Sequence, residues 1–167
     1  MKKALEALNA LVRTGVISKY AIGGAVGAMY YIDAVATEDV DAFVFLPASS
    51  SGLLDLSPIY AGLRAEGGTL EREYVRFGEW PVQILPDSND LVREAIREAP
   101  VVEFEGVSTW VFTAEHLCAI ALQTGRSKDF LRVAMFFEQE QVDRAKLREL
   151  ALRYALEAPL KRAESLQ

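Results

Sequence analysis

Apolar residues recur at two different spacings along the chain, and the changes of spacing predict the order of its elements. Between residues 3 and 13 they recur every three or four positions, which is typical of an amphipathic helix. The apolar runs 20–22 and 40–46 are short and bounded by turn residues, so they predict strands. Further helices are expected over residues 53–66, 89–98, 114–124, 127–138 and 143–157.

Two hairpins are predicted between these helices. Residues 71–77 and 80–85 flank Gly78-Glu79, and residues 101–104 and 107–112 flank a second glycine turn. Strands and helices therefore mix over the first two-thirds of the chain, and the last third is helical. This order predicts an α/β (α+β) fold, in which a mixed, twisted sheet carries flanking helices and a C-terminal helical cap. We expect an α/β core over residues 1–113 and a helical extension, 114–167, packed on the same domain.

Composition narrows the class of ligand. A chain of 167 residues with 51% apolar and 25% charged residues is typical of one globular domain. Its net charge of −6 repels nucleic acid, so a small ligand is favoured and a polynucleotide would need a local basic patch. The single cysteine, Cys118, excludes an internal disulfide and a cysteine-based zinc site. No apolar run approaches membrane-spanning length, so we expect a cytoplasmic protein without a membrane partner.

The candidate chemistry lies between the first two predicted strands. Gly23-Gly24 lets a ligand approach the backbone closely, and the amides of a helix start that follows are a plausible phosphate seat. Asp39 and Asp41 are two apart on an extended segment, so their carboxylates point to one face with Cβ atoms roughly 6–7 Å apart. Hard oxygens so placed suit Mg²⁺ held together with the phosphates of a substrate.

Other interpretations of these residues, most of them without a catalytic role, compete with a metal and phosphate site. An isolated Asp-x-Asp before a strand is more often a solvated turn than a metal site. A dinucleotide-binding fingerprint would need glycine where Ile22 stands, and further βαβ units where hairpins are predicted. His116, the only histidine, lies on an amphipathic helix without an accompanying serine or cysteine motif, which favours a partly buried or a surface residue over a catalytic one.

Two segments resemble the nucleotidyltransferase superfamily, which has the DNA polymerase β-like fold. Gly23-Gly24-Ala25, a helix of about three turns and then Asp39-Val40-Asp41 are similar to its signature. More narrowly, the chain resembles the branch of AbiEii-type abortive-infection toxins, because Glu115-His116-Leu117 and then the segment 125–129, Gly-Arg-Ser-Lys-Asp, are similar to that branch.

The resemblance implies metal-dependent transfer of a nucleoside monophosphate from an NTP to an acceptor such as RNA or protein. Asp39 and Asp41 would be catalytic and would hold Mg²⁺ or Mn²⁺. Gly23, Gly24 and Lys128 would contact phosphate. A toxin role would add an antitoxin as a partner, and leucines between residues 147 and 156 offer a surface for such a partner or for a second copy of the chain.

The chain also departs from the family pattern. Gln83 stands where relatives carry a third carboxylate, and Ala121 stands where they carry a lysine. Glutamine has no charge and cannot act as a base. Glu73, Glu79 or Asp87 would then have to substitute. Two functions stay open: an active nucleotidyltransferase, or a catalytically silent nucleotide-binding or regulatory module of the same fold.

Overall fold

A mixed sheet forms the centre of the fold. The computed structural model describes residues 1–33, 35, 37, 39–46 and 55–166. Its strands are β1 Lys19–Ile22, β2 Val40–Phe45, β3 Thr69–Glu71, β4 Tyr74–Phe77, β5 Trp80–Pro86, β6 Val101–Phe104 and β7 Val107–Trp110. Within the described ranges, the five-stranded sheet has the order β1-β2-β5-β4-β3. β2 and β5 are parallel, and the other neighbours are antiparallel. β6 and β7 form a separate hairpin.

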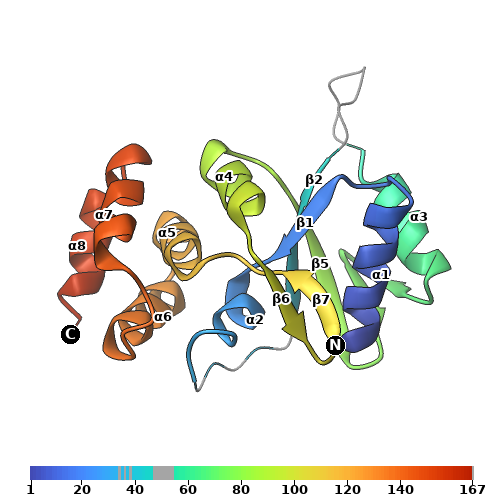
Figure 1. Cartoon of the computed structure of the whole chain (residues 1–167), viewed down its shortest axis with the longest axis horizontal. Coiled ribbons are helices and arrows are strands. Elements are labelled where there is room, and N and C mark those ends of the chain that lie inside the picture. The colour runs from blue at the N-terminus through green and yellow to red at the C-terminus, as the bar shows by residue number, and fades with distance from the viewer. Residues whose placement is uncertain (34, 36, 38, 47–54, 167) are drawn as a thin grey trace.

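Helices cover both faces of this sheet. They are α1 Lys2–Arg13, α2 Gly24–Ala28, α3 Ser57–Ala65, α4 Asp90–Glu98, α5 Ala114–Thr124, α6 Ser127–Glu138, α7 Arg144–Arg153 and α8 Glu157–Glu164. α1 and α3 pack on one face, and α2 and α4 pack on the other. The last four helices gather at one end of the molecule, where α5 contacts both α2 and α4 (Figure 1). The predicted mixed α/β fold with a C-terminal helical cap is therefore confirmed.

The alternation of side chains along β2 places the site. Val40, Ala42 and Val44 are fully buried in the apolar cluster that includes α1 and α3. Phe43 and Phe45 point the other way and pack against the cluster formed by α4, α5 and α6. Because side chains alternate between the faces of a strand, Asp41 lies on the second face, toward the C-terminal helices.

Three elements differ from the expectation. The predicted strand 71–77 is itself a hairpin, because Arg72 has a φ of 57° and turns the chain between β3 and β4. The predicted helix 143–157 ends early, because Ala155 has a φ of 56° and separates α7 from α8. The helix after the glycine turn has five residues instead of three turns. It ends because the chain tightens into i→i−3 hydrogen bonds, such as Tyr31 N–H to the Ala28 carbonyl at 2.9 Å.

The other local expectations are borne out within two or three residues. The predicted loop after Pro47 and the start of the predicted helix 53–66 lie outside the described residues; α3 begins at Ser57, with proline in its first turn. None of the described helices combines the length and the apolar character that a bilayer crossing requires.

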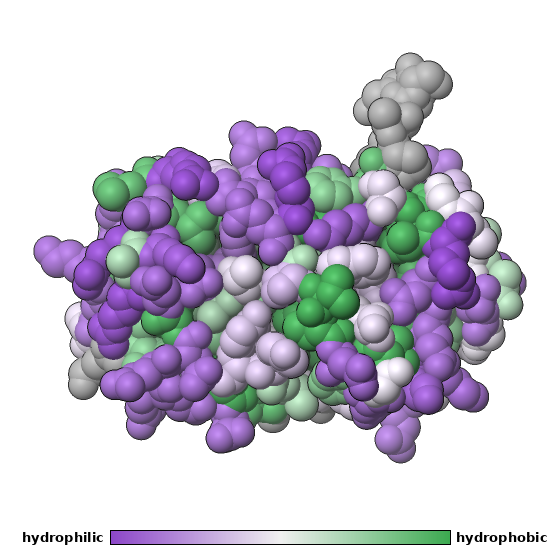
Figure 2. Space-filling model, in the orientation of Figure 1, coloured by the Kyte–Doolittle hydropathy of each residue, from purple (hydrophilic) through white to green (hydrophobic). Residues whose placement is uncertain are grey.

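The surface over the C-terminal helices is mostly hydrophilic (Figure 2). Leu147, Leu150 and Leu156 are buried in the core, so these leucines do not form the partner surface that the sequence offered. Leu152, by contrast, is 68% exposed.

Candidate active site

A broad cleft opens between the sheet and the start of α6. Its volume is about 1120 Å³. It is lined by Ala25, Thr37, Asp39, Asp41, Tyr74, Arg76, Pro81, Gln83, Arg126, Lys128 and Arg132. Among the residues described, the lining thus joins two acids and four cations from segments that are distant in the sequence. The predicted site residues Asp39, Asp41, Gln83 and Lys128 all lie in this cleft.

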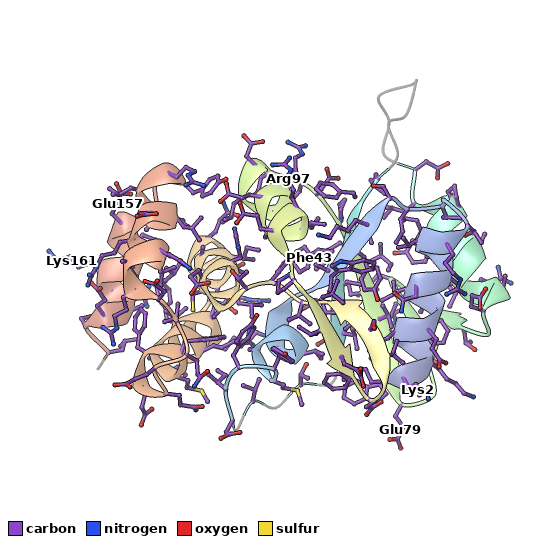
Figure 3. The ribbon with its side chains drawn as sticks, viewed as in Figure 1. Lys2, Phe43, Glu79, Arg97, Glu157 and Lys161 are labelled. Carbon is purple, nitrogen blue, oxygen red and sulfur yellow. The ribbon has the colours of Figure 1, made fainter. Side chains whose placement is uncertain are left out.

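The two glycines have different surroundings. Gly23 donates its backbone N–H to the carbonyl oxygen of Asp41 at 3.0 Å, and a Cβ at Gly23 would lie 2.6 Å from Phe43 Cε2. Phe43 lies near the centre of the molecule in Figure 3. Gly24 has a φ of +56°, and a Cβ there would overlap Asp41 Oδ2. The absence of a side chain at Gly23 therefore allows the core to pack closely, and its absence at Gly24 allows the Asp41 carboxylate to approach the backbone. The phosphate contacts expected of both glycines stay predictions.

Asp39 and Asp41 lie at the N-terminal end of β2. Asp41 is its second residue, and Asp39 precedes the strand by one position. The Thr37 hydroxyl donates to Asp39 Oδ1 at 3.1 Å, which orients that carboxylate. No lysine or arginine among the described residues forms an ion pair with either acid, so both keep oxygen lone pairs for a ligand.

Asp41 is a poorly solvated carboxylate. Burial and, to a smaller extent, the neighbouring Asp39 raise the pKa of Asp41 to about 6, while Arg132, Arg126 and Lys128 act in the opposite direction. Burial raises the pKa because the charged form loses water. A cation placed between the two acids would favour the charged form of Asp41 and so oppose both effects.

Replacing Asp41 by asparagine is expected to stabilise the metal-free protein. Because the pKa is raised from 3.8 to about 6, protonated Asp41 favours the folded state fully below pH 3.8, and that contribution is lost as the pH rises to about 6. An asparagine side chain at this position carries no charge at any pH. The free energy of unfolding in urea should therefore rise by on the order of 2 kcal/mol at pH 8 and change little at pH 4.

The matched control is Glu103→Gln, which removes one charge from an exposed position in β6. It should leave the free energy of unfolding nearly unchanged at both pH values. An Asp41→Asn variant that is less stable than the wild type at pH 8 would contradict a desolvated carboxylate.

Gln83 lies directly beside Asp41. Parallel pairing of β2 with β5 sets Asp41 opposite Gln83, and antiparallel pairing sets Tyr74 on the other side of Gln83. Paired residues on neighbouring strands point to the same face, so all three side chains share the face that forms the cleft. Gln83 therefore occupies the position at which the resemblance expects a third carboxylate, and it offers a neutral amide there.

The acids considered as substitutes for that carboxylate do not line the cleft. Glu79 projects from the turn between β4 and β5 and lines an adjoining cavity of about 420 Å³ (Figure 3). Asp87 follows β5 and pairs with Arg93 at 3.2 Å. Glu73 belongs to the turn between β3 and β4. Among the described residues, the cleft acids are Asp39 and Asp41.

The start of α6 supplies most of the positive charge. Asp129 is 1% exposed and accepts hydrogen bonds from the backbone N–H of Arg126 at 3.3 Å and from its Nε at 2.7 Å. Arg132 Nη1 lies 3.8 Å from the other oxygen of Asp129. Asp129 thus caps the helix and holds both arginines at the cleft. Lys128 lies between them in the sequence and lines the same wall.

Sequence reasoning misses several of these groups. It selects Lys128 and assigns no role to Arg126, Arg132, Arg76 or Tyr74. The position of Arg132, four residues after Lys128, is a signal that places both on one helix face. Tyr74 and Arg76 are two residues apart on β4, so their side chains lie on the same face of the sheet.

Solved structures share this architecture. The chain is similar to an antigenic nucleotidyltransferase-like protein from Paracoccidioides brasiliensis, with 13% identity, a TM-score of 0.56, and 97% of this chain and 90% of that chain covered. It is also similar to the antibiotic-resistance factor ANT(2'')-Ia in solution, with 16% identity, a TM-score of 0.55, and coverage of 99% and 98%. The crystal structure of ANT(2'')-Ia in complex with adenylyl-2''-tobramycin is similar as well, with 16% identity, a TM-score of 0.50, and 92% of this chain and 94% of that chain covered.

The sequence matches no protein-family model and no curated protein. At these low identities the likeness is one of fold. The chain has the fold of the nucleotidyltransferase superfamily.

Proposed function

We propose that the protein binds a nucleoside triphosphate with a divalent metal ion in the cleft and transfers the nucleoside monophosphate to an acceptor. The observation that carries the proposal is the contact of the Asp41 carboxylate with Gly24, which sets an acid directly against a helix start. The fold shared with nucleotidyltransferases supports it. So do the four cations of the cleft, whose charge suits a triphosphate.

The donor set fits a divalent metal ion. Asp39 and Asp41 offer hard oxygens, and the carboxylate of Asp41, whose pKa is raised by burial, gains most from a nearby cation. These two residues would hold Mg²⁺ or Mn²⁺, and the ion would supply positive charge to the phosphate oxygens.

The chain's own groups would position the nucleotide. Backbone N–H groups of the first turn of α2 lack intrahelical acceptors and can donate to phosphate. Lys128, Arg126 and Arg132 would neutralise phosphate charge from the opposite wall. The acceptor would present a hydroxyl from RNA, protein or a small molecule. For comparison, the crystal structure of ANT(2'')-Ia is of its complex with adenylyl-2''-tobramycin.

A second candidate function is a silent nucleotide-binding module, and Gln83 is the observation that favours it. A neutral amide beside Asp41 leaves the cleft without a third carboxylate among the described residues. Binding would then occur with little turnover. The narrower likeness to AbiEii-type toxins, with an antitoxin partner, stays a prediction.

Calorimetry with Mg²⁺ and each NTP, together with label transfer to RNA and protein acceptors, separates these functions. Lys128→Met should weaken NTP binding about tenfold, because a phosphate contact is lost. The control Lys161→Met removes a lysine from α8 that does not line the cleft and lies at the outer end of the molecule (Figure 3), so it should leave the affinity unchanged.

Binding and transfer that both require Asp41, tested with Asp41→Ala, support the enzyme. Binding without transfer supports the silent module. If no NTP binds at millimolar concentration, both proposals fail.

A further inference from the structure

The single histidine lies at a second cavity, outside the nucleotide cleft. His116 is 2% exposed in the first turn of α5. Its Nδ1 is 2.9 Å from the Thr113 hydroxyl oxygen. Its Nε2 is buried and has no hydrogen-bond partner within the part of the chain that the structure describes. A buried nitrogen without a partner costs roughly 1–3 kcal/mol, so it points to a group that completes the site.

Two carboxylates face this nitrogen. Glu94 and Glu98 are one turn apart on α4, and their oxygens lie 3.5 and 4.0 Å from His116 Nε2. One ligand atom from each of the three residues lies within 4.8 Å of the others. Both separations exceed the about 2.7–2.9 Å of a charge-assisted hydrogen bond. Ligand atoms in a tetrahedral site with bonds of about 2.0–2.1 Å are about 3.3 Å apart. The Glu94 separation is close to this value, and the exposed Glu98 side chain would move closer on binding.

Glu94 is held in place by its neighbours. The Tyr154 hydroxyl donates to its Oε2 at 2.6 Å, and Arg153 Nη1 donates to its Oε1 at 2.6 Å. Hydrogen-bonded carboxylates of this kind are usual around metal ligands, because the outer contacts fix the ligand's orientation. Thr113 can do the same for the imidazole by accepting a hydrogen bond from Nδ1, which leaves Nε2 free to ligate.

The cavity also has the charge that a cation requires. Its volume is about 300 Å³, and its lining includes four carboxylates and two cations, a net charge of −2 among the residues described. It shares no lining residue with the nucleotide cleft.

We infer that Glu94, Glu98 and His116 bind a divalent transition-metal ion of the Zn²⁺ class. One imidazole and two carboxylates form a mixed nitrogen and oxygen set that suits this class, and all three residues line the cavity, from which water could supply a fourth ligand. Because the ligands come from α4 and α5, a bound ion would join the helix on the sheet to the first of the C-terminal helices and stabilise their contact.

Zinc titration of the full chain tests the site. Isothermal titration calorimetry should give one Zn²⁺ per chain, and Co²⁺ should give the visible absorption of a tetrahedral ion. Glu98→Gln should weaken Zn²⁺ binding about tenfold or more, because a ligand loses its charge. The Glu98 side chain is 57% exposed, so this substitution does not threaten the fold. The matched control is Glu149→Gln, which removes one charge from the same cavity and should change the affinity less than about threefold.

Asp41→Ala, which alters the acids of the nucleotide cleft, should leave Zn²⁺ binding at this site intact. Bound Zn²⁺ should raise the Tm of the wild type, and it should not raise the Tm of Glu98→Gln. The inference is overturned if the chain binds no Zn²⁺, if Glu98→Gln binds it as tightly as the wild type, or if Asp41→Ala abolishes the binding.

Discussion

Substitution of Gly24 by alanine is expected to lower the affinity for a metal-bound NTP by up to about a hundredfold. The new Cβ would overlap Asp41 Oδ2 and lie 2.8 Å from its Cγ. Asp41 has a short side chain on a paired strand, so its carboxylate must rotate away from the helix start. That rotation separates the metal ligand from the phosphate seat, and disturbing the group that orients a metal ligand typically costs about 10–100-fold in metal affinity.

Calorimetry with Mg²⁺-NTP measures this effect, and a matched variant separates it from backbone strain. Gly15 has a φ of +74°, and a Cβ there would meet nothing within 4 Å. Gly15→Ala should therefore show the cost of a left-handed alanine alone, about 1–2 kcal/mol of unfolding free energy, with unchanged NTP affinity. Equal NTP affinities for Gly24→Ala and the wild type would contradict the proposal that Asp41 and the start of α2 bind the nucleotide together.

Substitution of Gln83 by aspartate is expected to strengthen Mg²⁺ binding about tenfold and to raise label transfer more steeply. The β2–β5 register puts position 83 beside Asp41 on the cleft face, so the new carboxylate completes a set of three. Without metal, the added negative charge would raise the pKa of Asp41 further, because like charges disfavour ionisation. The gain should therefore be measured at pH 8, where both carboxylates are ionised, and should shrink toward pH 6.

The control is Gln83→Asn, which has the size of aspartate and no charge. It should not strengthen Mg²⁺ binding. The double variant Gln83→Asp/Asp41→Ala should also lose the gain, because the new carboxylate acts together with Asp41. A gain that survives in the double variant would show that the metal binds elsewhere.

The elements could be predicted from short stretches of sequence because their causes are local. Thr113 caps α5 by accepting from the His116 N–H, and Gly125 ends the helix with a φ of 73°. Both effects act within one turn of helix. Two of the three errors arose where a single residue took a left-handed conformation that its residue type does not predict, at Arg72 and Ala155.

Only those residues of the site that lie close together in the sequence could be predicted. Gly24, Asp39 and Asp41 belong to one strand–helix–strand segment, β1-α2-β2, so their spacing indicated a common site. Which cations face them depends on α6, which α5 and the apolar core hold near the cleft.

Local sequence was thus sufficient for most of the helices and strands and for the acidic pair, and the resemblance to a family supplied the expected position of a third carboxylate. Only long-range packing brought Arg126 and Arg132 to the cleft and left the His116 Nε2 buried opposite Glu94. The reason is physical: hydrogen-bonding and steric preferences act over a few residues, whereas strand pairing and apolar burial join segments that no spacing in the sequence relates.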